Sequence, residues 1–397
     1  MRRGIYSLII LFFLAFGPAL NNYAAAAIND PSSINSAVAT AARTGGTVTI
    51  STAKKLKADL TVPSNVSIVI SYGGKIVKTS NYTLDINGPF SAGLYQVFSD
   101  FNPGDITFGN GSIEKVIPQW WGAKGDGITD DSGPINSAIA ALPANGGEIS
   151  LVSGNYLITN TVKIYKKIFF HGTGGYGSIG TSATIITKAA WLNGPAISVS
   201  GTGSVLERFW LKGQDGNVGD GIRVAGPDAT NIVLEKIGIS RIGRDGIRIG
   251  QDNPGGNQNE WRIDSVISVG NGRNGVTIDD DNSSYLNPAN ANAGTSTSLQ
   301  VINNGQDGLF INMGGVNTFI GTLAELNHRY GVHLSHAAHW EAFFGGDFNE
   351  ANKKSDFMIA PSDPGQGVNM IFGAEIGRLT DHGERTMIQA PVRTLQR

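Results

Sequence analysis

One short pattern repeats through the second half of the chain, and it limits the fold more than any other feature. Each copy is a Gly followed by a strand whose first and third residues are apolar. The copies are Asp220-Gly221-Ile222-Arg223-Val224, Asp245-Gly246-Ile247-Arg248-Ile249, Asn274-Gly275-Val276-Thr277-Ile278, Asp307-Gly308-Leu309-Phe310-Ile311 and Tyr330-Gly331-Val332-His333-Leu334. Ser355-Asp356-Phe357-Met358-Ile359 continues the series, and the spacings are 25, 29, 33, 23 and 25 residues. Because further short strands fit between the copies, the repeat predicts an all-β chain wound into a parallel β-helix.

An asparagine recurs at one place in the turns that precede these strands. Asn271, Asn304, Asn327 and Asn352 each stand four residues before the Gly position. In stacked coils such residues form a column, and their amide groups can satisfy the turn backbone of the neighbouring coil. We therefore predict that these asparagines are structural.

A second repeat indicates that the stack of strands starts twice. Residues 34–39 read INSAVA and residues 135–140 read INSAIA, and the match continues to the pairs Gly45-Gly46 and Gly146-Gly147. Each copy predicts a short helix that ends before the Gly pair. A helix at the blunt end of a solenoid shields its apolar interior from water, so we expect two short N-terminal capping helices.

The N-terminus has the layout of a secretory signal peptide. Arg2 and Arg3 precede an apolar run that begins at Ile5, and small residues near Ala27 supply a cleavage site. We therefore expect a secreted or periplasmic protein. The expected organisation is a signal peptide at 1–27, an N-terminal cap with short strands at 28–117, the β-helix at 118–380 and a C-terminal tail at 381–397.

Charge and cysteine content exclude several classes of function. The chain has no Cys, which excludes a disulfide framework, a thiolate metal site and a Cys nucleophile. It carries 30 Lys and Arg against 32 Asp and Glu, without a basic block that would bind nucleic acid. We expect no nucleic-acid partner and, after signal cleavage, no membrane contact. The sequence does not indicate the oligomeric state.

The stretch from Trp120 to Ser132 reads WWGAKGDGITDDS and is followed by the second capping helix. It resembles the N-terminal signature of the pectate-lyase-like β-helix superfamily, which includes rhamnogalacturonases, polygalacturonases, uronate epimerases and phage tailspikes. With the coil repeats, the resemblance covers roughly residues 118 to 380. It implies a right-handed parallel β-helix that works on a polysaccharide. Within the motif it implies structural roles, with tight turning at Gly125 and Gly127 and helix capping by Asp130 and Asp131.

The resemblance predicts the fold but does not fix the reaction. The sequence lacks the Gly-His-Gly of polygalacturonases, the Asp-Pro-His-Asp of alginate epimerases and the Arg-x-Pro-x-x-Arg of pectate lyases. Function on a shared fold depends on the residues of the site, so a site has to be sought in this chain itself.

Alternation along the repeated strands indicates where such a site would lie. If the first and third residues after Gly point inward, the second and fourth face outward. The second positions are Arg223, Arg248, Thr277, Phe310, His333 and Met358, and the fourth include Asp279 and Asn312. Arginines and amides suit the carboxylates and hydroxyls of a sugar acid, and a ring suits a pyranose face. Adjacent arginines would repel each other unless an anion lay across them.

We predict that Arg223, Arg248, Phe310 and Asn312 bind the substrate and that Asp279, Asp280, Asp281 and His333 are catalytic. The polar insertions at 251–259 and 280–298 are expected to wall this face, since long loops on a rigid scaffold often carry function. Glu325 and Glu350 would stack on a different edge, where we expect a structural role. His333, His336 and His339 lie three residues apart, which on a strand does not converge the rings on a metal.

These residues predict an exported protein that binds and cleaves an acidic, uronate-containing polysaccharide. A lyase would use Arg248 to neutralise a uronate, and His333 or an Asp-activated group would take its C5 proton. A hydrolase would pair Asp279 with Asp280 or Asp281. The alternative to an enzyme is a surface or matrix β-helix that only binds glycans. The sequence assigns no cofactor, and Ca²⁺ is considered only for the lyase.

Overall fold

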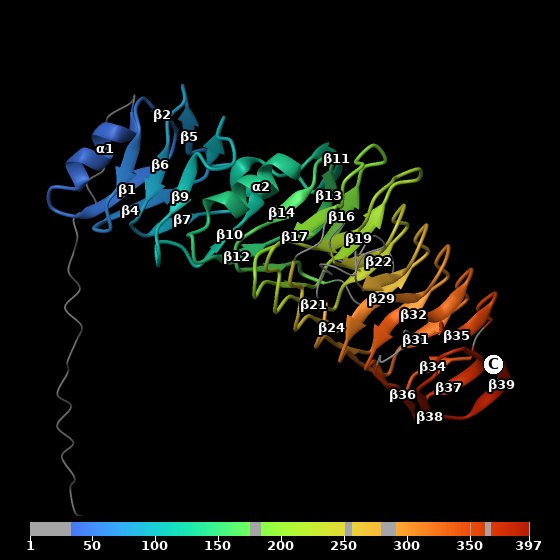
Figure 1. Cartoon of the computed structure of the whole chain (residues 1–397). Coiled ribbons are helices and arrows are strands. Elements are labelled where there is room, and N and C mark those ends of the chain that lie inside the picture. Colours follow the sequence, from blue (N-terminus) through green and yellow to red (C-terminus); the bar gives the residue numbers. More distant parts are fainter. Residues whose placement is uncertain are drawn as a thin grey trace, which may run out of the picture.

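The protein is an elongated stack of coils in the computed structural model, which describes residues 33–174, 184–250, 256–278, 291–349, 351–361 and 367–396 (Figure 1). The strands of successive coils pair in parallel. Of the two short α-helices in the described residues, α1 (Ile34–Ala41) precedes the strands and α2 (Ser132–Ala141) follows the N-terminal coils. The predicted all-β fold, a right-handed parallel β-helix with short capping helices, is confirmed. Among the described helices, none is both long and apolar enough to cross a membrane.

The N-terminal region is itself a small β-helix of three coils. Helix α1 (Ile34–Ala41) precedes nine strands that form three sheets of three strands each. These strands are β1 (Gly46–Ile50), β4 (Val66–Ile70) and β7 (Phe90–Ala92); β2 (Ala53–Leu56), β5 (Lys75–Lys78) and β8 (Phe98–Ser99); and β3 (Leu60–Val62), β6 (Leu84–Ile86) and β9 (Ile106–Phe108). The region at 28–117, expected to be a cap with short strands, therefore contains complete coils.

The main stack has three faces, which we call the first, second and third sheets. The first sheet has 11 strands, and the second and third join into one 19-stranded sheet. The first sheet consists of β10 (Lys115–Val116), β12 (Gly147–Ser150), β15 (Ile168–His171), β18 (Val205–Glu207), β21 (Val233–Glu235), β24 (Arg262–Asp264), β27 (Thr295–Thr297), β30 (Thr318–Ile320), β33 (Ala342–Phe344), β36 (Asn369–Phe372) and β38 (Thr386–Gln389).

The other two sheets follow the first within each coil. The second sheet consists of β11 (Asp126–Asp130), β13 (Gly154–Ile158), β16 (Thr184–Lys188), β19 (Trp210–Gly213), β22 (Gly238–Ser240), β25 (Ile267–Val269), β28 (Gln300–Ile302), β31 (Leu323–Glu325) and β34 (Asp347–Phe348). The third consists of β14 (Val162–Ile164), β17 (Ile197–Val199), β20 (Ile222–Val224), β23 (Ile247–Ile249), β26 (Val276–Ile278), β29 (Leu309–Gly315), β32 (Tyr330–His339), β35 (Ser355–Ile359) and β39 (Val392–Gln396). Strand β37 (Glu375–Asp381) pairs with both β34 and β35 and so joins the two sheets.

The stack continues to its last described residues. Strands β38 and β39 pair with β36 and β37. The expected C-terminal tail at 381–397 is therefore corrected, because most of it belongs to the final coil. Its sequence lacks the Gly-strand pattern by which the earlier coils were recognised, and ordinary ladder hydrogen bonds hold it in place instead.

The two repeated helices cap the two stacks in the same way. In α1, Asn35 Oδ1 accepts from the backbone N–H of Lys57 and its Nδ2 donates to the carbonyl of Ala58. In α2 (Ser132–Ala141), Asn136 makes the equivalent pair of bonds with Lys163 N–H and Thr161 C=O. The repeated asparagine thus fixes the first coil onto its cap in each copy.

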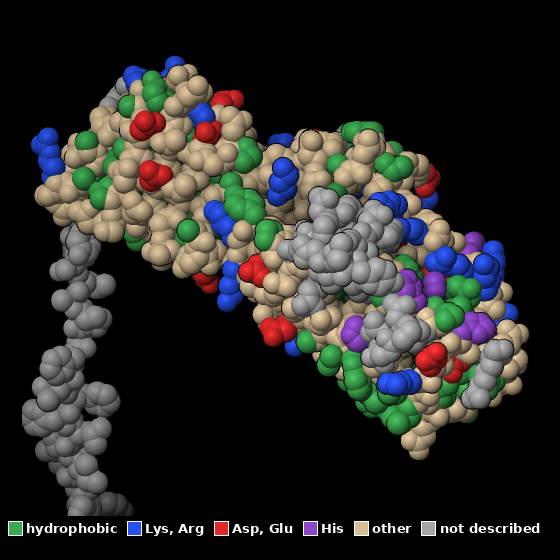
Figure 2. All heavy atoms as spheres, viewed as in Figure 1, with side chains coloured by type: hydrophobic (Ala, Val, Ile, Leu, Met, Phe, Trp, Pro, Cys, Tyr) green, Lys and Arg blue, Asp and Glu red, His purple; other side chains and the backbone are tan. Residues whose placement is uncertain are grey.

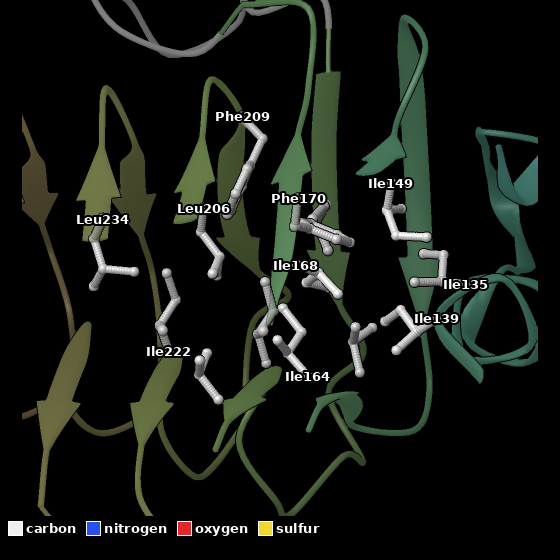
Figure 3. Packing of buried hydrophobic residues seen from close by; sticks show 14 of the residues in the cluster. Ile135, Ile139, Ile149, Ile164, Ile168, Phe170, Leu206, Phe209, Ile222 and Leu234 are labelled. Atoms are coloured by element: carbon white, nitrogen blue, oxygen red, sulfur yellow. The ribbon is translucent and has the colours of Figure 1, made fainter. Parts of the chain in front are cut away.

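Helix α2 also closes the apolar interior of the main stack. Its buried Ile135 and Ile139 lie against the inward-facing side chains of the first coils (Figure 3). Farther along, the first and third residues of the repeated strands are buried as predicted; Ile222, Ile247 and Val276, for example, are all fully buried. These inward columns form one continuous core with that of the N-terminal coils.

The predicted asparagine column is confirmed as a hydrogen-bonded ladder. Asn271 Nδ2 donates to Asn304 Oδ1 at 2.9 Å, Asn304 to Asn327 at 2.9 Å and Asn327 to Asn352 at 3.0 Å. The same three side-chain oxygens also accept backbone N–H groups. Asn304 Oδ1 accepts the N–H of Asn271, Asn327 Oδ1 that of Asn304, and Asn352 Oδ1 that of Asn327. All four side chains are buried, so the ladder satisfies polar groups that water cannot reach.

The Asp pair of the signature motif has the expected structural role, with one correction. Asp130 accepts the N–H of Ser132 at 3.0 Å and so bonds the start of α2. Asp131 makes no capping bond. Its buried carboxylate instead accepts the N–H groups of Lys124 and Gly125, at 2.7 and 3.0 Å, because the loop folds back over it. Gly125 has φ +60°, a left-handed conformation that glycine adopts without strain.

A buried glutamate interrupts a second column of polar side chains. Asn317 Nδ2 donates to Glu341 Oε1 at 3.1 Å, and the N–H of Glu341 donates to Asn369 Oδ1 at 3.0 Å. Glu341 is fully buried, and its Oε2 has no hydrogen-bond partner among the described residues. Burial raises the pKa of this carboxyl well above its ordinary 4.5, despite the bond from Asn317.

We predict that Asn327→Ala destabilises the fold by about 2 to 3 kcal/mol, because it removes the buried oxygen that accepts the backbone N–H of Asn304 and one of its two side-chain hydrogen bonds. Urea denaturation followed by circular dichroism measures this change. The exposed Asn81 offers a matched control, since Asn81→Ala removes the same side chain from the surface. Equal midpoints for the two variants would contradict a structural role for the ladder.

Glu341→Gln should change how the stability of the fold depends on pH. The raised pKa means that the folded state keeps the proton above pH 4.5, where the unfolded state releases it. The wild type therefore loses stability as pH rises above that value, by up to about 1.4 kcal/mol per pH unit, until the buried carboxyl ionises. Glutamine cannot ionise, so the stability of the variant lacks this loss. The melting temperature of the variant minus that of the wild type should therefore increase from acid to neutral pH. A constant difference would show that Glu341 does not titrate in this range.

Candidate functional site

The outward second positions of the third sheet form one column in the structure. Strand pairing places Lys163, Ser198, Arg223, Arg248, Thr277, Phe310, His333 and Met358 side by side in that order. Two positions before the predicted set, Lys163 and Ser198, thus belong to the same face. The column is accessible near Lys163, buried at Arg248 and Thr277, and partly accessible again from Phe310 onward.

The prediction that the whole column faces solvent is therefore wrong at its centre. Arg248 is 1% exposed and Thr277 is fully buried. Thr277 Oγ1 accepts from Asn274 Nδ2 at 3.0 Å, so it is part of the turn structure. Alternation along a strand predicts whether a side chain points inward or outward. It does not predict whether other parts of the protein cover an outward side chain.

Buried aspartates lie beside the arginines of this face. Burial, and the neighbouring Asp245 after it, raise the pKa of Asp220, while Arg244, Arg248 and Arg223 act to lower it. Acidic groups that can balance the adjacent arginines thus lie within the protein. An external anion is therefore not required to explain why these arginines are neighbours.

The aspartates belong to a turn column directly before the Gly positions. The N–H of Asn274 donates to Asp245 Oδ1 at 3.1 Å, and the N–H of Asp307 donates to Asn274 Oδ1 at 3.0 Å. Arg273 forms a two-pronged ion pair with Asp245, and Arg329 forms the equivalent pair with Asp307. Both arginines are partly exposed, whereas both carboxylates are buried, so fixed cationic groups line this edge of the third sheet.

His333 is held by the last of these aspartates. Its Nδ1 lies 3.0 Å from Asp307 Oδ2. Burial raises the pKa of Asp307, but hydrogen bonds from His333 and Arg329 outweigh burial and hold it below its ordinary value. An ionised carboxylate only accepts hydrogen bonds, so Nδ1 carries the proton in this pair and the lone pair of a neutral ring lies on Nε2.

Aromatic and cationic groups surround the histidine. The rings of Phe310 and Tyr330 both have centroids 4.9 Å from that of His333. The guanidinium of Arg329 lies 5.6 Å and the ammonium of Lys354 5.9 Å from the centre of the Tyr330 ring. The His333 side chain remains 16% exposed, so a ligand can reach it. Histidine, Lys and Arg side chains gather on the C-terminal part of this face in Figure 2.

A groove of about 670 Å³ opens at the other end of the column. Its lining includes Lys163, Ser198 and Arg223 from three successive strands, together with Tyr165 and Pro195. The Tyr165 side chain is 52% exposed. The predicted residue Arg223 thus borders a real groove, which lies several coils away from His333.

Several predicted site residues cannot be placed. Asp279, Asp280 and Asp281, most of the two insertions, and Glu350 lie outside the described residues. Asn312 lies in β29, where the pairing with β32 shifts register, and Glu325 ends β31 in the second sheet. Within the described ranges, no three His, Asp or Glu side chains are grouped so as to hold a metal ion.

Sequence reasoning missed three residues that the structure brings into the site. Asp307 stands directly before Gly308 in the repeat, and from this position its buried carboxylate reaches the outward His333. Arg329 could have been found from the stacking, because it lies 56 residues after Arg273 and repeats its bond to the turn aspartate. Lys163 precedes the recognised repeats, so no pattern indicated it.

No protein-family profile matches this sequence. Among curated proteins, the chain is 29% identical over 160 residues to depolymerase 1, capsule KN3-specific, of Klebsiella phage KN3-1. That match covers 34% of this chain and 19% of the phage protein, so the chain spans about a fifth of the relative's length.

Solved structures with a similar shape share little sequence with this chain. The phiAB6 tailspike, solved with oligosaccharides of the Acinetobacter baumannii surface polysaccharide, has 14% identity and a TM-score of 0.46, covering 70% of this chain and 47% of that one. ORF18 of Geobacillus virus E2 has 15% identity and a TM-score of 0.43, with coverages of 71% and 60%. The A-module of the mannuronan C-5 epimerase AlgE6 of Azotobacter vinelandii has 15% identity and a TM-score of 0.38, with coverages of 71% and 90%. No residue role follows from likeness at this level.

We predict that Asp307→Ala destabilises the fold by about 2 to 3 kcal/mol, since it removes a buried acceptor of charged hydrogen bonds. His333→Ala should change stability by less than about 1 kcal/mol, because Asp307 keeps its bonds to Arg329. Denaturation at neutral pH measures both changes. The lowered pKa of Asp307 means that its contribution is present above its ordinary pKa of 3.8 and is lost as pH falls through the lower folded value. Equal losses in the two variants would show that Asp307 is not the structural centre of the cluster.

Proposed function

We propose that this protein binds an acidic polysaccharide and cleaves it with His333 as the base. The observation that carries the proposal is the pairing of His333 with the buried Asp307 on an accessible face. The carboxylate engages Nδ1, which leaves Nε2 as the ring nitrogen that can accept a proton. A positioned histidine with an oriented partner is a common arrangement for proton transfer.

The surroundings of His333 suit a sugar acid. Arg329 and Lys354 supply positive charge, and both lie close to the ring of Tyr330. Arg329 replaces Arg248 as the group that we expect to neutralise a uronate, because Arg248 is buried and Arg329 is partly exposed. The C5–H bond beside an ionised carboxylate is only weakly acidic, and this low acidity is the difficulty that a uronate lyase has to overcome. Neutralising the carboxylate makes that bond more acidic.

The chemistry that follows is an elimination. His333 Nε2 takes the proton from C5 of the uronate, and the electron pair of that C–H bond becomes the C4=C5 double bond. The C4–O bond to the neighbouring sugar then breaks, and the leaving oxygen takes a proton from water or from the histidinium. Asp307 stabilises the positive charge that His333 gains during transfer.

The matched relative supports the substrate class. The phage protein is named a depolymerase specific for a capsule, which agrees with a polymer on a cell surface as the substrate. The match covers only 19% of that protein, so the relative's other regions have no counterpart in the comparison. We therefore propose the substrate for the β-helix of this chain and for no further region. The secreted or periplasmic location expected from residues 1–27 would bring the site to such a polymer and forms part of the proposal.

Cleavage can be tested on polygalacturonate, alginate, hyaluronan and Klebsiella capsular polysaccharide. We expect the wild type to release unsaturated, ultraviolet-absorbing product from at least one of them. His333→Ala should lower kcat at least about 100-fold while binding is retained, the usual scale for a lost general base. His382→Ala is the matched control, since His382 is exposed in the last coils and should not affect turnover.

The other outcomes separate the alternatives. New reducing ends without absorbance would replace the lyase by a hydrolase, and Asp279→Asn would then be the variant that abolishes turnover. Binding without any product would leave a glycan-binding module. Full activity in His333→Ala would remove His333 from the mechanism.

A further inference from the structure

We infer that the groove around Lys163 is a second saccharide-binding site, which holds an anionic sugar of the same polymer away from His333. The inference rests on the proposed function for the identity of the polymer. It concerns residues that the cleavage step does not use.

The groove is built from rigid parts of the stack. Lys163, Ser198 and Arg223 occupy matching positions on β14, β17 and β20. The backbone of Lys163 is fixed by Asn136 of α2 at 2.9 Å, and Thr161 Oγ1 donates to the carbonyl of Pro195 at 2.7 Å across the rim. The positions of the lining side chains are thus set by the cap and the strands, which favours binding without reorganisation.

The lining has the chemistry of a site for a sugar acid. Two cationic side chains, Lys163 and Arg223, are accompanied by the hydroxyls of Thr161, Ser198 and Ser200, and none of the described lining residues is Asp or Glu. Tyr165 presents an exposed ring, which can pack against the apolar face of a pyranose. The volume of about 670 Å³ is that of a typical small-ligand site.

Position separates this groove from the His333 site. Four steps of strand pairing lead from Arg223 to His333, or about 19 Å at the usual strand spacing. Of the three intervening positions, Arg248 and Thr277 are buried and Phe310 is partly exposed, so buried side chains separate the groove from the His333 site. A sugar in the groove cannot touch His333, and the groove therefore acts on binding of the polymer and not on the chemical step.

The test compares binding with turnover in the full chain. In the double variant Lys163→Ala, Tyr165→Ala we expect binding of the acidic polymers polygalacturonate, alginate and hyaluronan to weaken about tenfold for whichever the wild type binds, measured by calorimetry at low salt. At saturating polymer its kcat should equal that of the wild type. Lys115→Ala, which removes an exposed lysine from the first sheet, is the matched control and should bind normally.

Each outcome decides one claim. Wild-type affinity in the double variant overturns the second site and leaves the proposed cleavage intact. Weakened binding with unchanged kcat supports the site, and it does so even if His333→Ala keeps its activity and the proposed mechanism fails. Equal loss of affinity for neutral dextran would replace the anionic-sugar site by a general glycan surface and so overturn the inference. Failure of the wild type to bind any of the acidic polymers overturns it as well.

Discussion

Hydrogen bonding between the turns of successive coils is the constraint on which the rest of this structure depends. On the flat faces of a β-helix, the strand ladders supply hydrogen bonds to the backbone N–H and C=O groups. At each corner the ladder ends, and buried backbone groups there need other partners, because water cannot reach them. Here the side chains at the corners supply the missing partners, through the column that begins at Asn271 and through the aspartates and asparagine before the Gly positions. The coils can differ in length because these corner residues keep them in register.

The same corner residues set the electrostatics of the candidate site. The aspartates stay buried, and each brings an arginine to the surface in a fixed orientation, as Asp245 does for Arg273. Asp307 does this for Arg329 and also orients His333. One structural carboxylate therefore positions both an arginine and a histidine. The site is an elaboration of the fold's own corner chemistry, and no separate loop is needed to hold these groups.

The sequence predicted the features that repeat and missed those that do not. The Gly-strand pattern located the third sheet, and constant spacing identified the asparagine column, because both reflect a condition that every coil must meet. The burial of Arg248 could not be predicted, since alternation says nothing of what covers a face. Asp307 was missed because its position in the repeat belongs to a turn, and the pattern does not show that a turn carboxylate also reaches His333 on the strand of the next coil. The N-terminal coils and the last strands lack the pattern, and so their place in the stack was visible only in the structure. The proposed sites themselves stay predictions.

Stacking also gives the molecule a unit of length. Groups on one face of a β-helix can be separated only by whole coils, each about 4.8 Å high, and a monosaccharide in an extended glycan advances by a similar distance. The interval between Arg223 and His333 is therefore a whole number of steps on a scale close to that of the polymer. Duplication or loss of one coil between them would change that interval by about one sugar without altering either end. Under the proposed function, specificity for the repeat length of the polysaccharide can evolve by a change in the number of coils, independently of the residues at either site.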